Sequence, residues 1–261
     1  MRYAKKSLGQ NFLIDKNIID KIISLTNIEN RDIVEIGPGK GALTEEILKK
    51  KPKSLTLIEK DSNLVEDLKI KFSEDKKIKI FNKDILDFDL EGLVKNKAII
   101  FGNLPFNISS QILVKIIKFK NWEPKFKDLI FMFQKELGEK ILGKYKTKNY
   151  SRISILTSYR LQSRKEFLVS ENCFFPKPKV TSIVIHFKPK KNKFFNIKNI
   201  STLEKVTNIL FSNKRKMINK NIKKILSKNE ISKIPQISLQ ARPSELKPEI
   251  YYKIAELIEV R

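Results

Sequence analysis

Short apolar runs alternate with amphipathic runs through the first half of the chain, and this alternation constrains the fold more than any other feature. The apolar runs are typical of buried strands, and the amphipathic runs have the period of helices. Five strands are predicted, at Asp32–Ile36, Ser54–Glu59, Ile78–Phe81, Ala98–Phe101 and Leu129–Phe133. Four helices are predicted, at Leu43–Lys50, Asn63–Phe72, Ser109–Lys118 and Lys135–Leu142. The pattern favours an α/β fold, a parallel sheet covered by helices on both faces.

The segments that flank this core predict further elements. A basic arm of about ten residues comes first, and Asp15 is placed to cap the helix that follows it. Arg152–Arg160 and Val180–Phe187 both predict extra strands. The alternation within Val180–Phe187 suits an antiparallel strand at the edge of the sheet.

The composition changes after Phe187, where a polar linker rich in lysine begins. Beyond it the sequence contains helical patterns only, and Pro248 is placed to begin the last helix. We therefore expect two domains, an α/β domain at residues 1–190 and a small helical domain at residues 191–261.

The chain is strongly basic, with 54 Lys and Arg against 29 Asp and Glu and a net charge of +25. Such a charge attracts polyanions and favours contacts with a phosphate backbone. Only a few of the basic residues are Arg, so a biased genome could also produce the excess of Lys. The run from Lys205 to Lys228 nevertheless contains no acidic residue, and this uneven distribution favours a nucleic-acid partner.

The single cysteine, Cys173, excludes an intramolecular disulfide and a zinc site built from cysteines. The amino terminus lacks the apolar segment of a signal peptide, and no apolar run is long enough to span a membrane. We therefore expect a cytoplasmic protein without a metal site or a membrane association. No apolar stripe on the predicted helices requires a partner subunit, so a monomer is expected.

Polar groups follow four successive predicted strands, at the edge where ligands of open α/β sheets bind. The first strand ends in VEIGPGKGALT, which fits the loose dinucleotide pattern G-x-G-x-x-G/A. Glu59 ends the second strand, at the offset expected of an acid that binds ribose hydroxyls, and Asp84 follows the third. Each feature alone is compatible with an ordinary turn or a solvated loop. Together they indicate a cofactor that contains adenosine.

The fourth strand ends in FGNLPF, within a stretch from Ala98 to Val114 that has no charged residue. The amine of a nucleobase is a poor nucleophile, because its lone pair is delocalised into the ring. Asn103 can offer a side-chain carbonyl to that amine, and the backbone carbonyl of Leu104 can offer a second acceptor. Pro105 restricts the residue before it, and Phe106 offers a face on which a base can stack. This turn therefore predicts chemistry on the amine of a base.

The combination of the glycine turn with NLPF resembles the S-adenosylmethionine-dependent amino-methyltransferases, with their Rossmann-like sheet. More closely, KSLGQNFL, VEIGPGKGALT, GNLPFNIS, FPKPKV and RPSELKPEIYYKIA resemble the ribosomal small-subunit RNA adenine dimethyltransferase family. The match covers nearly the whole chain. It implies S-adenosylmethionine as cofactor, the small ribosomal subunit and its rRNA as partner, and dimethylation of two adjacent adenosines near the end of that rRNA.

The resemblance also implies roles for individual residues. The candidates for binding the cofactor are Gln10, Asn11, Leu13, Gly37, Gly39, Glu59, Lys60, Asp84, Ile85 and Asn103. The candidates for catalysis are Asn103, Leu104, Pro105 and Phe106, and Phe106 with Phe174 would sandwich the target base. The candidates for binding RNA are Lys5, Lys6, Lys214, Arg215, Lys216, Lys220, Lys223 and Lys224. The family usually has Tyr at the position of Phe106, which keeps the stacking surface here but removes a hydroxyl.

Three alternatives remain open at this point. The chain could methylate adenine in large-subunit rRNA, although its GPG turn, its NLP motif and its C-terminal RPSEL segment argue against this. It could act mainly as a ribosome-assembly factor whose catalysis is dispensable. An NAD-dependent oxidoreductase would also use the glycine turn and Glu59, but it has no use for NLPF. His186, Cys173 and Trp122 are interpreted as structural residues.

Overall fold

A computed structural model of the chain describes Lys5, residues 8–190 and residues 194–261. It divides into two compact units, which are described separately. The first comprises residues up to Ile116 together with Glu123–Gly138 and Ser163–Pro189. The second comprises Ile117–Trp122, Glu139–Gln162 and Lys190–Arg261. The second unit therefore includes two segments that precede residue 190, the boundary predicted from the sequence. The predicted division into two domains stays a prediction.

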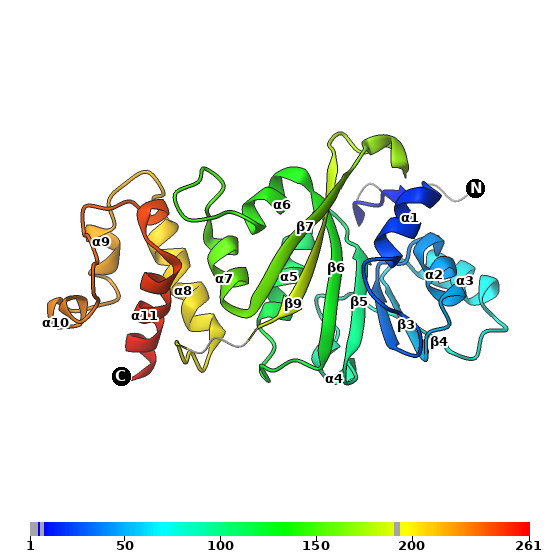
Figure 1. Cartoon of the computed structure of the whole chain (residues 1–261), viewed down its shortest axis with the longest axis horizontal. Helices are drawn as coiled ribbons and strands as arrows, with labels where there is room; N and C mark the ends of the chain where they lie inside the picture. Colours follow the sequence, from blue (N-terminus) through cyan, green and yellow to red (C-terminus); the bar gives the residue numbers. More distant parts are fainter. Residues whose placement is uncertain (1–4, 6–7, 191–193) are drawn as a thin grey trace. The chain divides into compact units, whose positions relative to one another are not determined.

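The first unit is built on a seven-stranded sheet (Figure 1). Its strands in spatial order are β4 (Ile78–Asn82), β3 (Ser54–Glu59), β2 (Asp32–Ile36), β5 (Ala98–Asn103), β6 (Phe126–Gln134), β9 (Ser182–Pro189) and β7 (Leu161–Val169). The helices that accompany it are α1 (Lys16–Ile23), α2 (Ala42–Lys49), α3 (Ser62–Lys71), α4 (Leu90–Leu93), α5 (Ser109–Ile117) and α6 (Lys135–Ile141). A separate two-stranded sheet pairs β1 (Phe12–Leu13) with β8 (Phe174–Phe175), directly after a 3₁₀ turn at Glu171–Cys173.

The strand order creates a switch point between β2 and β5. The chain runs outward from β2 through β3 to β4, and then returns to place β5 on the other side of β2. All neighbouring pairs from β4 to β6 are parallel, so their carboxyl ends meet at one edge of the sheet. An open sheet of this kind binds ligands at that edge, beside the switch point. The predicted α/β fold is confirmed.

The centre of the sheet is buried on both faces. Ala98–Phe101 of β5 are fully buried, as expected of a central parallel strand covered by helices. α1 begins at the predicted cap, where the carboxylate of Asp15 accepts a hydrogen bond from the amide of Ile18 at 3.0 Å. Its buried residues Ile19, Ile22 and Ile23 join β2, β3 and β5 in one hydrophobic core.

The second unit is helical. Its elements are α7 (Arg152–Arg160), α8 (Ile200–Phe211), α9 (Asn219–Ile222), α10 (Lys228–Ser232), a 3₁₀ turn at Pro243–Glu245 and α11 (Pro248–Glu259). Aromatic rings fill much of its interior. Tyr150 lies against Phe211, and Phe211 stacks on Tyr251 with ring centroids 5.8 Å apart. Pro248 begins the last helix, as the sequence predicts.

The prediction of a strand at Arg152–Arg160 is wrong, because this segment is the helix α7. Six of its nine residues are buried, including Ser154, Thr157 and Arg160. A helix buried on nearly all sides has no polar stripe, so its sequence resembles a buried strand. The Arg160 guanidinium satisfies the backbone carbonyls of Ile117 and Phe119 at 2.6 Å each, which allows a charged residue to sit in the interior.

Two further predictions need correction. Ser182–Pro189 pairs antiparallel with β6 as expected, but it is not the edge strand, because β7 lies outside it. β7 carries a polar, partly exposed sequence that gave no strand signal. The basic segment that follows α8 lies where only helical patterns are predicted, yet only Asn219–Ile222 of it is helical and Met217 is exposed.

None of the helices formed by the described residues combines the length and the apolar character that crossing a membrane requires. Within the same residues, no three histidine, cysteine or acidic side chains gather closely enough to hold a metal ion.

Candidate active site

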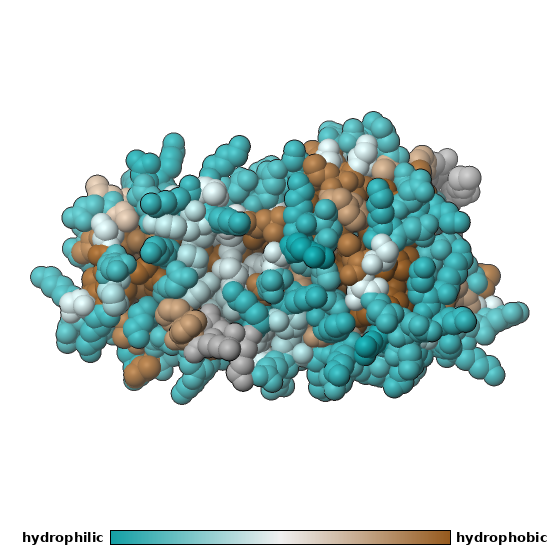
Figure 2. All heavy atoms as spheres, in the orientation of Figure 1, coloured by the Kyte–Doolittle hydropathy of each residue, from teal (hydrophilic) through white to brown (hydrophobic). Residues whose placement is uncertain are grey.

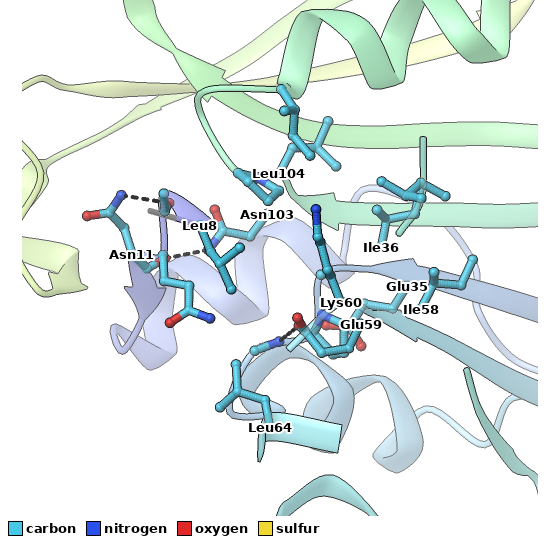
Figure 3. A pocket seen from close by; sticks show the side chains of 18 of the residues that line it. Leu8, Asn11, Glu35, Ile36, Ile58, Glu59, Lys60, Leu64, Asn103 and Leu104 are labelled. Atoms are coloured by element: carbon cyan, nitrogen blue, oxygen red, sulfur yellow. Dashed lines mark hydrogen bonds between the residues drawn. The ribbon is translucent and has the colours of Figure 1, made fainter. Parts of the chain in front are cut away.

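A pocket lies at the carboxyl ends of β2, β3, β4 and β5 in the first unit (Figure 3). It encloses about 210 Å³, and residues 8–13 form a further wall. Every predicted cofactor residue lines it, namely Gln10, Asn11, Leu13, Gly37, Gly39, Glu59, Lys60, Asp84, Ile85 and Asn103. Leu104, Pro105 and Phe106 line it as well. Residues from five separate segments of the chain thus converge on one cavity.

The glycine turn after β2 has backbone conformations that other residues rarely adopt. Gly37 has φ of +67° and Gly39 has φ of +57°. A Cβ atom on Gly39 would lie 2.8 Å from the ring of Phe12, so this glycine also lets β1 pack closely on the turn. The glycine at 39 is therefore required by the contact with Phe12 as well as by any ligand.

Glu59 is 8% exposed and its carboxylate is held from two sides. One oxygen accepts the amide N–H of Asp61 at 2.9 Å, and the other accepts that of Gly39 at 3.2 Å. Burial raises the pKa of Glu59 above its ordinary value, although these hydrogen bonds oppose the effect. The hydrogen bond from Gly39 thereby connects the carboxyl end of β3 to the glycine turn.

Asp61 is a site residue that the sequence analysis did not identify. Its carboxylate accepts hydrogen bonds from Gln10 Nε2 at 2.9 Å, from Lys5 Nζ at 2.8 Å and from the amide of Asn63 at 3.1 Å. Burial raises the pKa of Asp61, but the hydrogen bonds from Lys5 and Gln10 outweigh that effect and hold it below its ordinary value. Asp61 therefore caps α3 and ties the N-terminal segment to the pocket.

Lys5 was predicted to bind RNA, but in the structure it is occupied by this ion pair with Asp61. A lysine paired with a buried carboxylate is a poor ligand for phosphate, since binding would break the pair. Lys6, the other predicted RNA ligand of the arm, lies outside the described residues.

Glu35 lies beneath the glycine turn and is fully buried in β2. Thr44 Oγ1 donates a hydrogen bond to Glu35 Oε2 at 2.7 Å. Burial raises the pKa of Glu35 to about 7, and the nearby Glu59 contributes in the same direction. The role of this carboxyl group could not be predicted from the sequence, because an acid inside a buried strand has no local signature.

Asp84 occupies the end of β4, where it forms an ion pair with Lys60 at 2.7 Å. Its other oxygen accepts the amide of Leu86 at 2.9 Å. The hydrogen bond from Lys60 is the main cause that holds the pKa of Asp84 below its ordinary value. Ile85 beside it is buried and gives the pocket an apolar wall.

The turn after β5 presents two hydrogen-bond acceptors. Asn103 Nδ2 donates to the backbone carbonyl of Asn11 at 3.0 Å, which fixes the orientation of the amide and leaves its Oδ1 available (Figure 3). The carbonyl of Pro105 accepts from the Ile108 amide, and that of Phe106 accepts from Ser109 Oγ. Among the described residues, no hydrogen bond uses the carbonyl of Leu104.

Phe174, which is predicted to stack on the target base, is not among the residues that line this pocket. In the β1–β8 pair Leu13 lies opposite Phe174, and both side chains are buried in the hydrophobic core. Successive side chains of a strand point to opposite faces, so the next residue, Phe175, is the exposed ring. Phe174 is 3% exposed and Phe175 is 58% exposed.

The remaining RNA-binding candidates, Lys214, Arg215, Lys216, Lys220, Lys223 and Lys224, are all exposed in the second unit. None of the three residues interpreted as structural lines the pocket. His186 Nε2 lies 2.7 Å from Asp128 Oδ1 inside the sheet. Cys173 is buried, and Trp122 donates from its ring nitrogen to the carbonyl of Lys190.

Comparison with known proteins identifies the family. The profile of the family described as "Ribosomal RNA adenine dimethylase" matches residues 1–259. The chain belongs to this family. It is 44% identical to the "Ribosomal RNA small subunit methyltransferase A" of Pelagibacter ubique (strain HTCC1062), over 98% of this chain and 97% of that protein. It is 40% identical to the protein of the same name from Malacoplasma penetrans (strain HF-2), over 97% and 91% of the two chains.

Solved structures agree with this assignment. A dimethyladenosine transferase from Plasmodium falciparum matches with a TM-score of 0.76 and 25% identity, covering 93% of this chain and 95% of that one. The 23S rRNA methyltransferase ErmE matches with a TM-score of 0.69 and 21% identity, covering 95% and 100%, and shares the fold. The chain is thus an rRNA adenine dimethyltransferase, and its cofactor is S-adenosylmethionine.

The residues present fit that cofactor. The pocket contains three carboxylates, Glu35, Glu59 and Asp84, and two of them are buried. Buried carboxylates suit a sulfonium cation. The family assignment removes the NAD-dependent alternative.

Proposed function

We propose that this chain dimethylates the exocyclic amine of two adjacent adenosines near the 3′ end of small-subunit rRNA. The observation that carries the proposal is the pair of acceptors after β5, the oriented Oδ1 of Asn103 and the carbonyl of Leu104, at the rim of a carboxylate-lined pocket. The names and near full-length similarity of the relatives support the small subunit as the substrate.

S-adenosylmethionine, when bound, supplies a methyl group on a positively charged sulfur. Asn103 Oδ1 and the Leu104 carbonyl accept hydrogen bonds from the two hydrogens of the adenine amine, which turns the nitrogen lone pair out of the ring. As the amine accepts the methyl group, positive charge would pass from the sulfur to the nitrogen. The two fixed acceptors stabilise that charge without reorganising. The proton then leaves the nitrogen for solvent, and the same steps repeat for the second methyl group.

The other pocket residues hold the cofactor. Glu59 would hold the ribose hydroxyls, Asp84 the adenine amine and Ile85 the adenine ring. The turn at Gly37 and Gly39 accommodates the methionine portion, while Gln10, Asn11 and Leu13 cover it and Lys60 orients Asp84. Pro105 fixes the turn, and Phe106 stacks on the target base, which must leave its own stack first.

The exposed cations of the second unit bind the rRNA backbone. Lys214, Arg215, Lys216, Lys220, Lys223 and Lys224 are the residues assigned to this role. Because phosphate contacts release counterions, the affinity for RNA falls steeply as salt rises. We further propose that the protein acts as a monomer in the cytoplasm. Sedimentation at micromolar concentration tests the monomer, since a dimer would double the measured mass.

The test is mass mapping of rRNA after the protein is incubated with S-adenosylmethionine and unmethylated ribosomal subunits, small and large separately. Two adjacent dimethyladenosines in the small subunit are expected, with the large subunit unchanged. Methylation of the large subunit alone would overturn the substrate assignment. Tight binding to small subunits without methyl transfer would favour a role in assembly instead.

A further inference from the structure

The loop between α6 and α7 carries three exposed lysines, Lys144, Lys146 and Lys148, within the second unit. No acidic residue occurs anywhere from Lys140 to Lys165. Among the described residues, none of the three lysines has a carboxylate within ion-pairing distance. Among the described residues, the loop therefore presents positive charge that no carboxylate within ion-pairing distance neutralises.

The backbone of this loop is folded into a defined turn. The amide and the hydroxyl of Thr147 both donate to the carbonyl of Lys144, at 3.0 and 2.7 Å. The two ends of the loop meet, since a Cβ atom on Gly143 would lie only 2.4 Å from the carbonyl oxygen of Asn149. Lys146 has φ of +66°, a conformation that a residue with a side chain adopts only when its surroundings impose it. The lysines thus project from a preformed backbone, which lowers the entropy lost on binding.

The loop lies beside the basic segment that follows α8, residues 212–216 (Figure 1). The ring of Tyr150, at the end of the loop, packs on Phe211 with centroids 6.5 Å apart. Lys214 Nζ reaches the carbonyl of Lys148 at 3.5 Å. Two acid-free segments that are more than sixty residues apart in the sequence therefore form one surface, which we call the loop–α8 surface. Its cations are Lys144, Lys146, Lys148, Lys214, Arg215 and Lys216.

A lysine-rich chain exposes lysines everywhere, and Figure 2 shows hydrophilic side chains over most of the face it draws. Many of them are neutralised locally. Lys71 pairs with Glu45, Lys95 with Asp32, and Lys118 with Glu204 in the second unit itself. The loop–α8 surface differs because six cations are brought together without one carboxylate. Like charges held close together repel each other, and a polyanion relieves that repulsion on binding.

We propose that the α6–α7 loop binds the phosphate backbone of the substrate RNA together with Lys214, Arg215 and Lys216, as one preformed site. The proposal rests on the proposed function, in which the partner is rRNA. It adds three phosphate ligands that neither a sequence motif nor the resemblance to the family assigns. It also gives the loop a role in affinity and not in the chemical step.

The test compares two variants that each lose three positive charges. The loop variant is Lys144→Gln, Lys146→Gln and Lys148→Gln. The matched control is Lys50→Gln, Lys51→Gln and Lys53→Gln, which changes three exposed lysines in the turn before β3, where Lys51 also has a positive φ of +53°. That turn lies at the amino edge of the parallel sheet, the edge opposite the pocket. Affinity for unmethylated small subunits is measured across a range of KCl concentrations.

We expect the loop variant to bind about tenfold or more weakly near 0.1 M salt, with the slope of log affinity against log salt reduced by about two, since each lost phosphate contact contributes roughly 0.7–0.9. The control should stay within about twofold of the wild type, because none of its charges contacts phosphate. Equal losses in both variants would mean that net charge alone acts, and would overturn the proposal. An unchanged affinity in the loop variant would overturn it as well.

A third variant and one activity measurement complete the design. Lys144→Arg, Lys146→Arg and Lys148→Arg keeps the charges and should keep the affinity, which excludes a folding defect as the cause of the loss. At saturating subunit concentration the glutamine loop variant should methylate at the wild-type rate. If the wild type methylates only large subunits, but the loop variant still loses affinity and salt slope relative to the wild type and the control does not, the proposed function fails and the loop assignment stands. If the wild type methylates small subunits and the loop variant binds them normally, only the loop assignment fails.

Discussion

In the first unit the charged groups around the pocket are held by hydrogen bonds, whereas in the described part of the second unit no cation of the loop–α8 surface forms an ion pair. Glu59 is fixed by two backbone amides and Asp61 by two side chains and an amide. Lys144, Lys146 and Lys148 have no carboxylate near them. Both regions have a preformed backbone. The pocket fixes the directions of its hydrogen-bond acceptors, whereas the loop–α8 surface fixes only the positions of its positive charges.

This difference reflects what each region must do. Methyl transfer needs acceptors at defined positions, because stabilisation of the developing charge depends on geometry. Binding to a phosphate backbone depends on the number and placement of charges and tolerates changes in side-chain orientation. Changes to the pocket should therefore alter the chemistry or the cofactor while RNA binding persists, and changes to the loop–α8 surface should do the reverse.

The largest expected effect belongs to Asn103→Ala, which removes one of the two acceptors. Methyl transfer at saturating substrates should fall by about 10²–10³-fold, by analogy with the loss of one fixed hydrogen-bonding group in other active sites. RNA affinity and its salt dependence should remain those of the wild type. Single-turnover kinetics and binding titrations measure the two quantities. A rate within tenfold of the wild type, or a parallel loss of RNA affinity, would break the separation between the two regions.

A pH-dependent effect on stability is expected from Glu35. Burial raises its pKa from an ordinary 4.5 to about 7. The folded protein therefore binds more protons than the unfolded chain between these values, so the free energy of unfolding falls as pH rises through this window. The loss is on the order of 3 kcal/mol by pH 8.

Glu35→Gln keeps an acceptor for Thr44 and does not titrate, so it should be as stable as the wild type near pH 4 to 5 and more stable above pH 7. Urea unfolding at several pH values gives the difference directly. Glu29→Gln, at an exposed position, serves as the control and should show no such trend. A constant difference between Glu35→Gln and the wild type across pH 4 to 8 would contradict the argument.

A smaller effect is expected from Asp61→Ser. Serine can still cap α3, but it cannot accept hydrogen bonds from both Gln10 and Lys5. The cofactor Kd should rise about tenfold, since a hydrogen bond to a charged group is worth roughly 1.5–3 kcal/mol and part of that loss reaches the cofactor through residues 8–13. Calorimetric titration with S-adenosylmethionine measures it.

Asp89→Ser provides the capping control, because Asp89 caps α4 through the amide of Gly92 and does not line the pocket. Its cofactor Kd should equal that of the wild type. If both serine variants lose similar affinity for the cofactor, the cause is the loss of a helix cap. The hydrogen bonds that Asp61 accepts from Gln10 and Lys5 would then not be responsible. If Gln10→Leu raises the cofactor Kd by the same factor in the Asp61→Ser background as in the wild type, the two residues do not act through their shared hydrogen bond.

The residues that meet at the strand ends could be predicted from the sequence, because two regularities act together. Buried runs define the parallel strands, and the carboxyl ends of parallel strands must meet at one edge. Gly37, Glu59, Asp84 and Asn103 follow four such runs, so their convergence on one pocket required no knowledge of side-chain contacts. The same reasoning predicted that Asn103 and Leu104 lie at this edge, and both line the pocket.

What could not be predicted depends on contacts between distant segments. Asp61 is 51 residues from Gln10, and nothing near either residue indicates their hydrogen bond. Whether Phe174 or Phe175 faces the core is decided by its pairing with β1, not by the FPKPKV motif. α7 was mistaken for a strand because burial on nearly every side removes the helical period.

The smallest expected effect concerns Phe106, where the family usually has Tyr. Phe106→Tyr adds a hydroxyl while keeping the stacking face, so the rate should change by no more than about threefold. Phe106→Leu removes the face and should cost roughly 1–3 kcal/mol of base stacking, a loss of about fivefold or more in the rate with subsaturating RNA. Both variants keep the acceptors, so the ratio of monomethyl to dimethyl product should stay unchanged. A large gain from Phe106→Tyr would show that the hydroxyl acts in the chemistry, and would place part of the acceptor function on the ring and not on Asn103 and Leu104 alone.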